Sequence, residues 1–526
     1  MAYVNAVFVT EGCVFMAEPH KPPLWLSAAI FIMLAVLIAA SVRIWKTDIH
    51  IILIICAVAA AAIGVFFLKN DYSAVERGLI DGIMTAMQAC LILYTVGTLI
   101  GTWIIAGVVP SMIYYGLMIL RPSVFLFAAL VICTIASLAT GSSWGTSGTV
   151  GIALMGIAAG LGIPAPLTAG IIISGAYCGD KMSPLSDTTN LAPAVSGTDI
   201  FQHVRAMCWT TLPTYAVVVV ITLLLCVKYS GGSIDSGKIT AMQSLMRAEF
   251  WIDPLALMPP LIVIFLSAVR KPALPSLWAG VIVAAGFAFF HGTGVREMLT
   301  IMQNGYTPTV SQTIADAADN SAALSKLLAE NNIAAAPEAV FQAAKDIIKL
   351  MQRGGLQSMN GTVSLIICAL AFGSVMETCG FLEVILEALI KPIKSTAGLI
   401  TATLVSCAAC DLFLSDQYLS IAITGRMFKP VYDERGLHPR MLSRSLEDSG
   451  TLLSALVPWN TCGAYQSGVL GVSTLEYLPY AFLNYLNPIF AAVLTYMGIG
   501  IFWRGRDGEP VKGGKTRPPQ LAEDAQ

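Results

Sequence analysis

A polar run, GDKMSPLSDTTN, interrupts an apolar stretch of the chain at residues 179–190. It contains five side chains that could bind or balance an ion: Asp180, Lys181, Asp187, Thr188 and Asn190. Carboxylate and hydroxyl oxygens are hard donors, which suit a small hard cation. The sequence Ser-Asp-Thr-Thr is also good helix-capping chemistry. The run therefore predicts an ion-binding site or, as the alternative, a capped helix end at a membrane surface.

Three more polar interruptions lie in apolar surroundings: TGSSWGTSG (140–148), CDLFLSDQYLS (410–420) and LVPWNTCGA (456–464). They supply the remaining candidate ligands for an ion or substrate: Ser142, Ser143, Thr146, Ser415, Asp416, Asn460 and Thr461. Backbone can leave the helix at membrane depth only where it is packed in protein or lines a wet cavity. We expect a site built from broken helices, with Na⁺ held by Asp187, Thr188, Asn460 and Thr461.

Five charged residues are candidates for carrying protons or compensating charge: Asp180, Lys181, Glu377, Asp411 and Asp448. An unpaired carboxylate at the membrane centre costs at least about 2.5–3.5 kcal/mol, so it needs a partner or a purpose. Glu377 lies in an uncharged run, where burial would favour its protonated form. Its alternative is a neutral, hydrogen-bonded acid. Structural ion pairs are the alternative for Asp180 with Lys181, and for Glu447-Asp448 with Arg440 and Arg444.

The composition indicates that these polar runs lie in a membrane protein. Hydrophobic residues make up 56% of the chain and charged residues 12%, and the mean hydropathy is +0.74. Soluble domains carry about 25% charged residues. Apolar runs such as 24–41 and 49–68 are long enough to cross a bilayer, which takes about 20 residues. We predict an all-α polytopic membrane protein with roughly 11 to 14 membrane segments.

The ends of the chain suggest how it is inserted. Residues 1–22 lack the basic start and apolar stretch of a cleavable signal, so the first span is expected to direct insertion. The tail contains five basic residues, Arg504, Arg506, Lys512, Lys515 and Arg517. The positive-inside tendency therefore predicts a cytoplasmic C-terminus. The net charge of -2 argues against a nucleic-acid partner.

Metal, redox and nucleotide chemistry find little support in the sequence. Most of the 12 cysteines lie in apolar runs, where cysteine acts as a small hydrophobe. Cys407-Ala-Ala-Cys410 has redox or metal spacing, but no second pair follows, so helix packing is favoured. The five histidines form no cluster, and no phosphate-binding GxxxxGK[ST] loop occurs. We expect no cofactor besides a transported ion.

The two halves of the chain match at a shift of 273 residues. Gly107 falls on Gly380, Ser142 on Ser415, Pro166 on Pro439, Asp187 on Asn460 and Thr188 on Thr461. At this shift, Asp411 and Asp416 correspond to Leu138 and Ser143. The polar turn of the second half therefore carries two more negative charges than that of the first. In transporters such repeats are often inverted, with the substrate site where they meet near mid-bilayer.

The repeat divides the chain into six expected regions. These are membrane helices at 1–84, a first repeat at 85–228, linking helices at 229–304, a polar insertion at 305–358, a second repeat at 359–503 and a polar tail at 504–526. Within the insertion, SQTIADAADNSAALSKLLAENN and APEAVFQAAKDIIKLMQR each predict an amphipathic helix, with a turn at 331–337. We expect these helices to form an extramembrane cap.

Long motifs in this order resemble the NhaC family of bacterial Na⁺/H⁺ antiporters. They are GSSWGTSGTVGIALMGIAAGLGIPAPLTAGIIISGAYCGDKMSPLSDTTNLAP, RGGLQSMNGTVSLIICALAFG, SDQYLSIAITGRMF, LSRSLEDSGTLLSALVPWNTCGAY and NYLNP. The resemblance implies two inverted repeats, each with a re-entrant hairpin and a broken helix. It also implies a homodimer in the bacterial inner membrane that works without ATP.

The expected function is secondary exchange of Na⁺ for protons by alternating access. The family also includes relatives that exchange Na⁺ for organic acids. The alternative is therefore Na⁺-coupled exchange or symport of a small carboxylate or other organic solute, with Trp144 and Trp459 near the broken segments. A membrane enzyme is less favoured because no nucleophile–base set or metal cluster is visible. A channel is less favoured because broken segments indicate an occluding site.

Overall fold

A computed structural model describes residues 21–230, 236–317, 321–331, 333 and 335–518. The first helices are α1 (Leu24–Ala40), α2 (His50–Ala62) and α3 (Tyr72–Thr85). They are followed by α4 (Met87–Ile105), α5 (Val108–Ile119), α6 (Pro122–Thr140), α7 (Ser143–Thr146), α8 (Ile152–Gly160), α9 (Ala165–Met182), α10 (Asp187–Ser196) and α11 (Ile200–Ser230).

The central part of the chain contains α12 (Ser236–Glu249), α13 (Met258–Ala268), α14 (Ala273–Phe290), α15 (Val295–Asn304), α16 (Thr309–Asp316), α17 (Ser321–Glu330) and α18 (Pro337–Met351). The last part contains α19 (Asn360–Thr378), α20 (Phe381–Ile390), α21 (Thr396–Phe413), α22 (Gln417–Glu434), α23 (Pro439–Leu446), α24 (Leu452–Ser454), α25 (Thr461–Leu470), α26 (Thr474–Tyr477) and α27 (Phe482–Met497). Two strands, β1 (Ile501–Arg504) and β2 (Pro510–Gly513), form an antiparallel pair.

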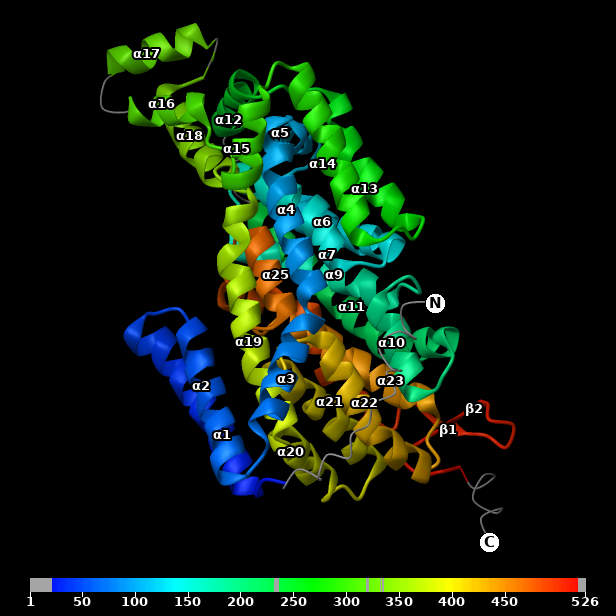
Figure 1. Cartoon of the computed structure of the whole chain (residues 1–526). Helices are drawn as coiled ribbons and strands as arrows, with labels where there is room; N and C mark the ends of the chain where they lie inside the picture. Colours follow the sequence, from blue (N-terminus) through cyan, green and yellow to red (C-terminus); the bar gives the residue numbers. More distant parts are fainter. Residues whose placement is uncertain (1–20, 231–235, 318–320, 332, 334, 519–526) are drawn as a thin grey trace.

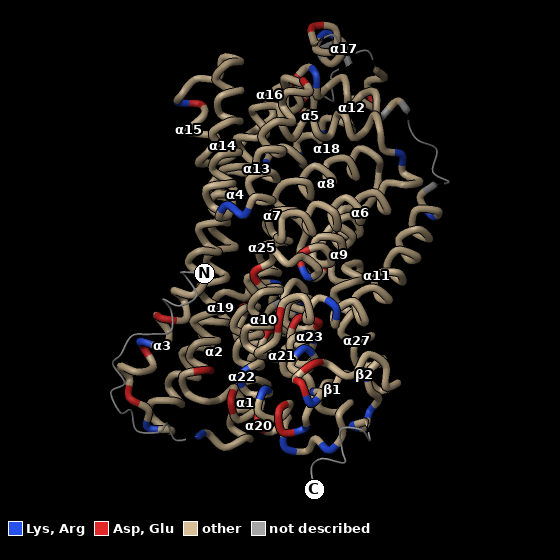
Figure 2. Tube along the Cα trace, turned by 90° about the vertical axis from the view of Figure 1, so that its right-hand side faces the viewer, with Lys and Arg blue, Asp and Glu red and all other residues tan. Residues whose placement is uncertain are grey.

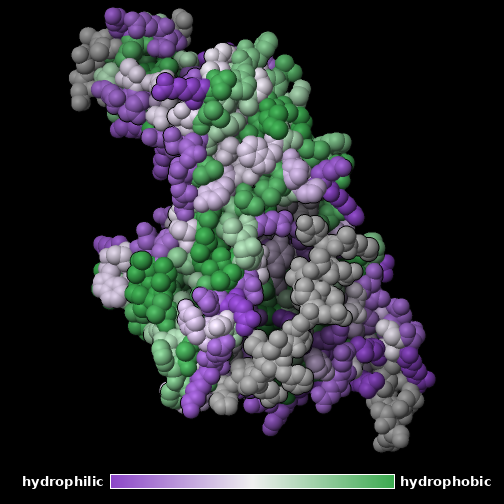
Figure 3. Space-filling model, in the orientation of Figure 1, coloured by the Kyte–Doolittle hydropathy of each residue, from purple (hydrophilic) through white to green (hydrophobic). Residues whose placement is uncertain are grey.

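Among the described residues, eight helices are long and apolar enough to cross a membrane. The pair Ile239–Glu249 and Pro254–Ala268, bent by 91°, raises this number to nine if it is one span. The expected 11 to 14 segments also included shorter and interrupted helices, which this count leaves out. Large apolar side chains such as Trp25, Ile282 and Phe290 are exposed on the outside. Figure 3 shows hydrophobic side chains along the body and hydrophilic ones towards both ends. The protein is a multi-pass, all-α membrane protein.

The two halves of the chain share one order of elements. At a shift of 273 residues, α4 coincides with α19, and α6 and α10 coincide with α21 and α25 to within one residue. The connection after α4 and the one after α19 each contain a glycine, Gly107 and Gly380, with the same positive φ of 74°. A left-handed turn costs glycine little, because it has no Cβ. The helix lengths and this turn are therefore repeated along with the sequence.

Each half contains two interrupted helices. In the first half, Gly141 (φ 66°) turns the chain between α6 and α7, and the residues between Met182 and Asp187 separate α9 from α10. In the second half, Ser415 (φ 60°) lies in the turn between α21 and α22, and the residues between Ser454 and Thr461 separate α24 from α25. These breaks fall at the four polar runs identified in the sequence.

The polar insertion forms the three helices α16, α17 and α18 at one end of the molecule (Figure 1). The prediction of two helices was wrong in number, because its first segment contains both α16 and α17. The helix ends agree with the predicted turn, since α17 ends at Glu330 and α18 begins at Pro337; residues 332 and 334 of that turn lie outside the described residues. The Glu249 carboxylate accepts hydrogen bonds from the backbone N–H groups of Thr309 (2.7 Å), Val310 (3.0 Å) and Ser311 (2.6 Å), so it caps α16.

The chain after α27 is partly folded rather than a plain polar tail. The side chains of Ile501, Phe502 and Trp503 are buried in an apolar cluster with residues of α22 and α23. The backbone N–H of His438 donates to the Phe502 carbonyl (3.1 Å), and that of Arg504 donates to the Gly436 carbonyl (2.9 Å). The strand pair is therefore docked on the connection between α22 and α23. We call residues 500–513 the C-terminal hairpin.

Candidate functional site

The turn between α6 and α7 supplies a hydroxyl to a buried carboxylate. Ser142 caps α7, since its Oγ accepts a hydrogen bond from the backbone N–H of Gly145 (3.0 Å). The next residue, Ser143, donates from its Oγ to Oδ2 of Asp180 (2.6 Å). Asp180 lies in the last turn of α9 and is 7% exposed. A short hydrogen bond to a carboxylate is among the stronger kinds. The first hairpin and the first broken helix therefore meet at Asp180.

The break between α9 and α10 makes a second contact, with the other half of the chain. The hydroxyl of Thr188 donates to Oε1 of Glu447 (3.0 Å), and the Glu447 side chain is fully buried. The hydroxyl of Thr189 donates to the carbonyls of Asp180 (3.3 Å) and Lys181 (3.0 Å). The Thr189 hydroxyl thus satisfies carbonyls that the end of α9 leaves without helical partners, while Thr188 links the break to the second half.

A buried ion pair lies beside these contacts. Nζ of Lys181 pairs with Oδ1 of Asp448, and both side chains are 0% exposed. The same oxygen accepts hydrogen bonds from Thr210 (2.9 Å) and Asn487 (2.8 Å). Nε of Arg444 lies 3.7 Å from the other oxygen, Oδ2. Asp448 therefore has two buried cations around it, and Lys181 is the closer one.

We call Asp180, Lys181, Glu447 and Asp448, with the residues that hydrogen-bond to them, the first centre. Figure 2 shows charged segments gathered in the middle of the molecule, between α9 and α23. Elsewhere charged residues lie mainly towards its two ends. The middle position places the first centre far from the ends, where water is expected.

The second half forms a separate acidic group at its own turn. The carboxylate of Asp416 caps α22 by accepting from the backbone N–H groups of Tyr418 (2.9 Å) and Leu419 (3.1 Å). Its Oδ2 also accepts a hydrogen bond from the hydroxyl of Thr461 (3.2 Å). Asn460 caps α25 and donates from Nδ2 to the Asp411 carbonyl (3.0 Å). We call Asp411, Ser415, Asp416, Asn460 and Thr461 the second centre.

Asp411 is the least compensated acid of the second centre. Its side chain is 0% exposed. Within the described part of the chain, neither of its carboxylate oxygens has a hydrogen-bond partner. Ionised burial of this kind is costly unless a cation or a proton is present. The hydroxyl of Ser415 in the same turn is also buried without a partner among the described residues. Both groups are therefore free to accept a ligand.

The buried acids outnumber the buried lysine and arginine side chains in the described residues. The acids are Asp180, Asp411, Asp416, Glu447 and Asp448. The lysine and arginine side chains are Lys181 and Arg444 in the interior, and Arg440, whose guanidinium lies 3.5 Å from the centre of the Phe502 ring. Five carboxylates in a membrane protein cannot all be charged at low cost with so few cations. The arrangement therefore requires added cations or protons.

Several predicted site residues are placed differently from the expectation. Asp187 is the first residue of α10 and is exposed, which suits the helix-end alternative as well as a ligand role. Asn190 is exposed, and its amide donates to the carbonyls of Pro184 (3.1 Å) and Ser186 (2.6 Å). These bonds use the Nδ2 donor and leave the amide oxygen, so the role of Asn190 as an ion ligand stays a prediction. Thr146 is buried, and its hydroxyl has no partner in the described part of the chain.

The proposed four-residue Na⁺ set is split between the two centres. Thr188 contacts Glu447, whereas Thr461 contacts Asp416, and Asn460 contacts the backbone of Asp411. In the described residues no hydrogen bond joins the first pair of the set to the second. Binding of one Na⁺ by all four residues therefore stays a prediction.

The prediction that Glu377 is buried was wrong. Its side chain is exposed, one residue before the end of α19. An uncharged stretch of sequence does not distinguish a side chain inside the protein from one on its outer face. Glu377 therefore belongs to neither centre.

Other residues of the site were missed or undervalued. Thr210 and Asn487 bind Asp448, although they are 238 and 39 residues away from it in the sequence. Asn487 lies in the NYLNP motif, which was a signal, but a threonine in an apolar helix gave none for Thr210. Tyr418 adjoins the second centre, since its backbone N–H donates to Asp416 (2.9 Å).

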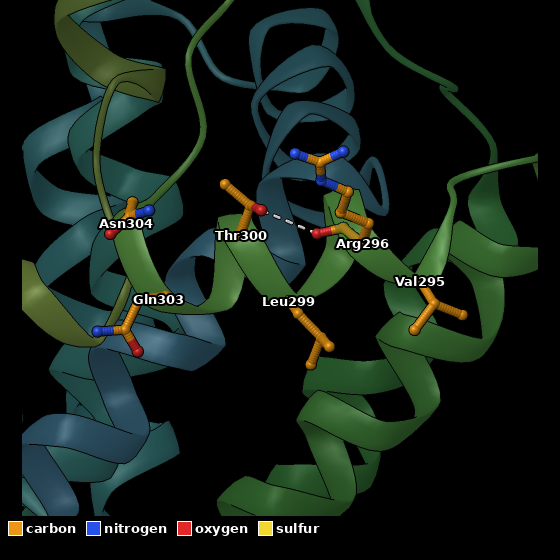
Figure 4. Close-up of a pocket in the computed structure, with 6 residues that line it drawn as sticks. All are labelled: Val295, Arg296, Leu299, Thr300, Gln303 and Asn304. Carbon is orange, nitrogen blue, oxygen red and sulfur yellow. Dashed lines mark hydrogen bonds between the residues drawn. The ribbon is translucent and has the colours of Figure 1, made fainter.

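A pocket of about 530 Å³ lies on α15, away from both centres. It is lined by Val295, Arg296, Leu299, Thr300, Gln303 and Asn304. Figure 4 shows Val295 and Leu299 on one side of this helix and Arg296 and Thr300 on the other. The hydroxyl of Thr300 donates to the carbonyl of Arg296 (2.8 Å), a bond within the helix. No predicted site residue lines this pocket, so it adds nothing to the ion site.

The interrupted helices and the excess of buried acid define the class of protein, a multi-pass membrane transporter of the secondary type. The chain belongs to the Na⁺/H⁺ antiporter family, whose model matches residues 14–189 and 175–499. It is 35% identical over 472 residues to the Na⁺/H⁺ antiporter NhaC of Alkalihalophilus pseudofirmus, covering 89% of this chain and 94% of that protein.

Two further relatives come from Bacillus subtilis. The chain is 37% identical over 437 residues to a malate-2H⁺/Na⁺-lactate antiporter, covering 83% of this chain and 86% of that one. It is 35% identical over 474 residues to a Na⁺/H⁺ antiporter NhaC, covering 90% of this chain and 97% of that one. The resemblance to the NhaC family expected from the motifs is confirmed.

Proposed function

We propose that this protein exchanges Na⁺ for protons across the bacterial inner membrane. The observation that carries the proposal is the set of five buried carboxylates in the described residues, which outnumber the buried lysine and arginine side chains and lie at the broken helices. Na⁺ and H⁺ can each neutralise a carboxylate in a low-dielectric interior, so they compete for the same groups. The choice of Na⁺ and H⁺ as the exchanged ions follows the names of the NhaC relatives above.

In the first centre, Lys181 acts as the internal countercharge. It pairs with Asp448 in this structure and lies within electrostatic range of Glu447. When the receiving carboxylates Asp180 and Glu447 are empty, Lys181 compensates part of their charge. A bound Na⁺ or proton replaces that compensation. The carrier then crosses more readily when loaded than when empty, because the empty form leaves charge unpaired in the membrane.

The remaining parts of the proposal follow the repeat. The regions 85–228 and 359–503 act as two inverted repeats, and rocking of one part of each against the rest exposes the centres alternately. The protein is a homodimer with its C-terminus in the cytoplasm, and it uses no cofactor and catalyses no chemical reaction. The site donors for Na⁺ are Asp180 with Ser143 and Glu447 with Thr188 in the first centre, and the acids of the second centre.

Transport in proteoliposomes tests the proposal. An imposed Na⁺ gradient should drive protons in the opposite direction with no organic solute present. Acidification should raise the Na⁺ concentration needed for half-maximal exchange, because protons occupy the same groups. A protein that moves protons only after a carboxylate is added does not perform simple antiport.

One observation favours a second candidate function. The rings of Trp144 and Tyr465 are stacked with centroids 4.1 Å apart, directly after the Ser142–Ser143 turn. Together with the malate-2H⁺/Na⁺-lactate antiporter among the relatives, this suggests a place for a small organic acid beside the ion. Exchange of a labelled carboxylate that requires Na⁺ would favour this candidate.

A further inference from the structure

Arg444 connects the C-terminal hairpin to the first centre. Its side chain is 1% exposed and lies on α23, one turn before Asp448. Nη1 donates a hydrogen bond to the carbonyl oxygen of Gly500 (2.8 Å), where the chain enters β1. Nε remains 3.7 Å from Oδ2 of Asp448, which is longer than an N–H···O hydrogen bond. The guanidinium is therefore anchored to the hairpin and only close to the carboxylate.

Gly500 cannot easily be another residue. Its φ is 69°, and a Cβ there would lie 3.2 Å from Cβ of Trp209 and 3.3 Å from Nη1 of Arg444. The backbone is thus fixed between α11 and the guanidinium. Trp209 directly precedes Thr210, which binds Asp448. The entrance to the hairpin is therefore packed against two elements that contact the first centre.

Further contacts attach the rest of the hairpin to the helices around it. Arg504 forms an ion pair with Asp433 at 2.6 Å. The Phe502 ring is buried against the Arg440 guanidinium, and the Lys512 ammonium lies 4.4 Å from the centre of the Trp209 ring. These contacts tie β1 and β2 to α11, α22 and α23.

We propose that the C-terminal hairpin is a clamp that positions Arg444 and so sets the affinity of the first centre for its cation. The inference rests on the proposed function. The Gly500 carbonyl occupies one donor of the guanidinium and keeps Arg444 from forming a full two-point pair with Asp448. Lys181 then remains paired with Asp448 and compensates Asp180 and Glu447 only from a distance, without a direct ion pair. Those two carboxylates are left for Na⁺ or a proton.

Loss of the clamp should lower the apparent affinity for Na⁺. A guanidinium released from Gly500 can turn to Asp448, because bidentate arginine–carboxylate pairs are strong. Lys181 would lose its partner and pair with the nearby carboxylates Asp180 and Glu447. It would then compete with Na⁺, and apparent Na⁺ affinity would fall. Arg444 is thus a positioning residue, since it acts through Asp448 and Lys181.

Two glycine substitutions in the full-length protein test the clamp. Gly500→Ala strains the carbonyl that binds Arg444. Gly498→Ala is the matched control, because Gly498 also has a positive φ (80°) but its nearest neighbours are Lys515 and Gly514. In proteoliposomes, Gly500→Ala should raise the Na⁺ concentration for half-maximal exchange by roughly fivefold or more. Its maximal rate should be nearly unchanged, and Gly498→Ala should leave both values unchanged.

The same pair in an Arg444→Gln background separates positioning from general damage. Without the guanidinium, Lys181 keeps Asp448, so Gly500→Ala and Gly498→Ala should give the same Na⁺ dependence. An equal effect of Gly500→Ala in both backgrounds overturns the clamp, as does unchanged Na⁺ dependence in Gly500→Ala alone. If the unmutated protein shows no Na⁺-driven exchange, the proposed function fails first and the clamp fails with it.

Discussion

Among the single residues, Asp180 is the acid best placed to hold a cation. It joins the first hairpin to the first broken helix through Ser143 and lies within electrostatic range of Asp187 and Glu447. Asp187, in contrast, lies exposed at the start of α10. The two carboxylates therefore allow a comparison between a buried ligand and an exposed helix-end acid in the same run of sequence.

Asp180→Asn should raise the Na⁺ concentration for half-maximal exchange by at least roughly tenfold, or abolish exchange. The amide keeps the size of the side chain but removes the charge that offsets a desolvated cation, and a tenfold change corresponds to about 1.4 kcal/mol. Asp187→Asn should change this value less. Both are measured as Na⁺-driven proton movement in proteoliposomes. A larger effect of Asp187→Asn would move the ion site to the helix end.

Glu377→Gln should leave the pH dependence of Na⁺ affinity unchanged. Its side chain is exposed on α19 and belongs to neither centre, so the shared protons must come from other acids. Half-saturating Na⁺ concentrations are compared between the variant and the unmutated protein over a series of pH values. A flattened profile in the variant would return Glu377 to the proton pathway.

At the scale of elements, the two hairpin turns use different residues for the same left-handed backbone. The first has Gly141 (φ 66°), and the second has Ser415 (φ 60°). For residues with a Cβ this conformation costs roughly 1–2 kcal/mol. The backbone strain is present at Ser415 and absent at Gly141. The Ser415 hydroxyl is buried without a partner in the described residues, which favours a role as an ion ligand.

Ser415→Gly should therefore stabilise the protein and weaken ion binding. Relief of the backbone strain should raise the free energy of unfolding by roughly 1 kcal/mol. Loss of the hydroxyl should raise the half-saturating Na⁺ concentration. Thermal unfolding in detergent measures the first effect and proteoliposome transport the second. A more stable variant with unchanged Na⁺ dependence would show that Ser415 is not a ligand.

Gly141→Ala should lower the stability of the protein. A Cβ at this position would lie 2.6 Å from the backbone carbon of Leu185 and 2.8 Å from the nitrogen of Ser186. The turn between α6 and α7 would then be pushed away from the α9–α10 break, and Ser143 with it. We expect a lower unfolding temperature and little exchange. A matched substitution is Gly162→Ala, which also has a positive φ (72°) but has no neighbour within 4 Å of the added carbon. Equal loss in both variants would mean that backbone strain alone is responsible.

The sequence predicted the elements better than their partners. Four polar runs correctly marked four helix breaks. Polar residues and glycine at membrane depth are expected mainly where the backbone leaves the helix inside the protein. The pairing of Lys181 with Asp448 crosses 267 residues, and no local pattern encodes such a contact. The burial of Glu377 was predicted wrongly because hydropathy describes lipid-facing and protein-facing positions in the same way. The roles of Asp187 and Asn190 stay predictions, because a helix start and an ion site use the same residue types.

At the scale of the whole molecule, the halves are joined by buried polar contacts across long sequence distances. Thr188 contacts Glu447, Lys181 contacts Asp448, and Tyr465 donates to the carbonyl of Trp144 (2.8 Å). Movement of one half against the other must therefore exchange these contacts. The C-terminal hairpin lies at the end of the chain, yet through Arg444 it reaches the same group. Docking of the hairpin is thus a property with consequences for transport.

Acid should loosen the hairpin through His438, which lies on the α22–α23 connection where the hairpin docks. Burial, together with the positive charge of Arg440, lowers the pKa of His438 from 6.5 to about 4. The docked state therefore keeps this imidazole neutral, whereas an undocked state would bind a proton below about pH 6.5. Above about pH 6.5, His438 is neutral in both states and does not oppose docking of the hairpin. As the pH falls towards about 4, protonation of the undocked state makes docking progressively less favourable.

Limited proteolysis of the tail in detergent measures this change. Cleavage within residues 500–513 should accelerate as the pH is lowered from 7 to 5, with rates corrected for the protease's own pH dependence on a cleavable peptide. His438→Asn keeps a side-chain acceptor for the Arg440 N–H, as His438 provides at 3.2 Å, but cannot titrate, so its cleavage should vary less with pH. His291→Asn, at an exposed histidine far from the hairpin, is the control. Equal pH dependence in all three proteins would assign the acid sensitivity to groups other than His438. Because the hairpin anchors Arg444, acid release would also weaken Na⁺ binding beyond simple proton competition.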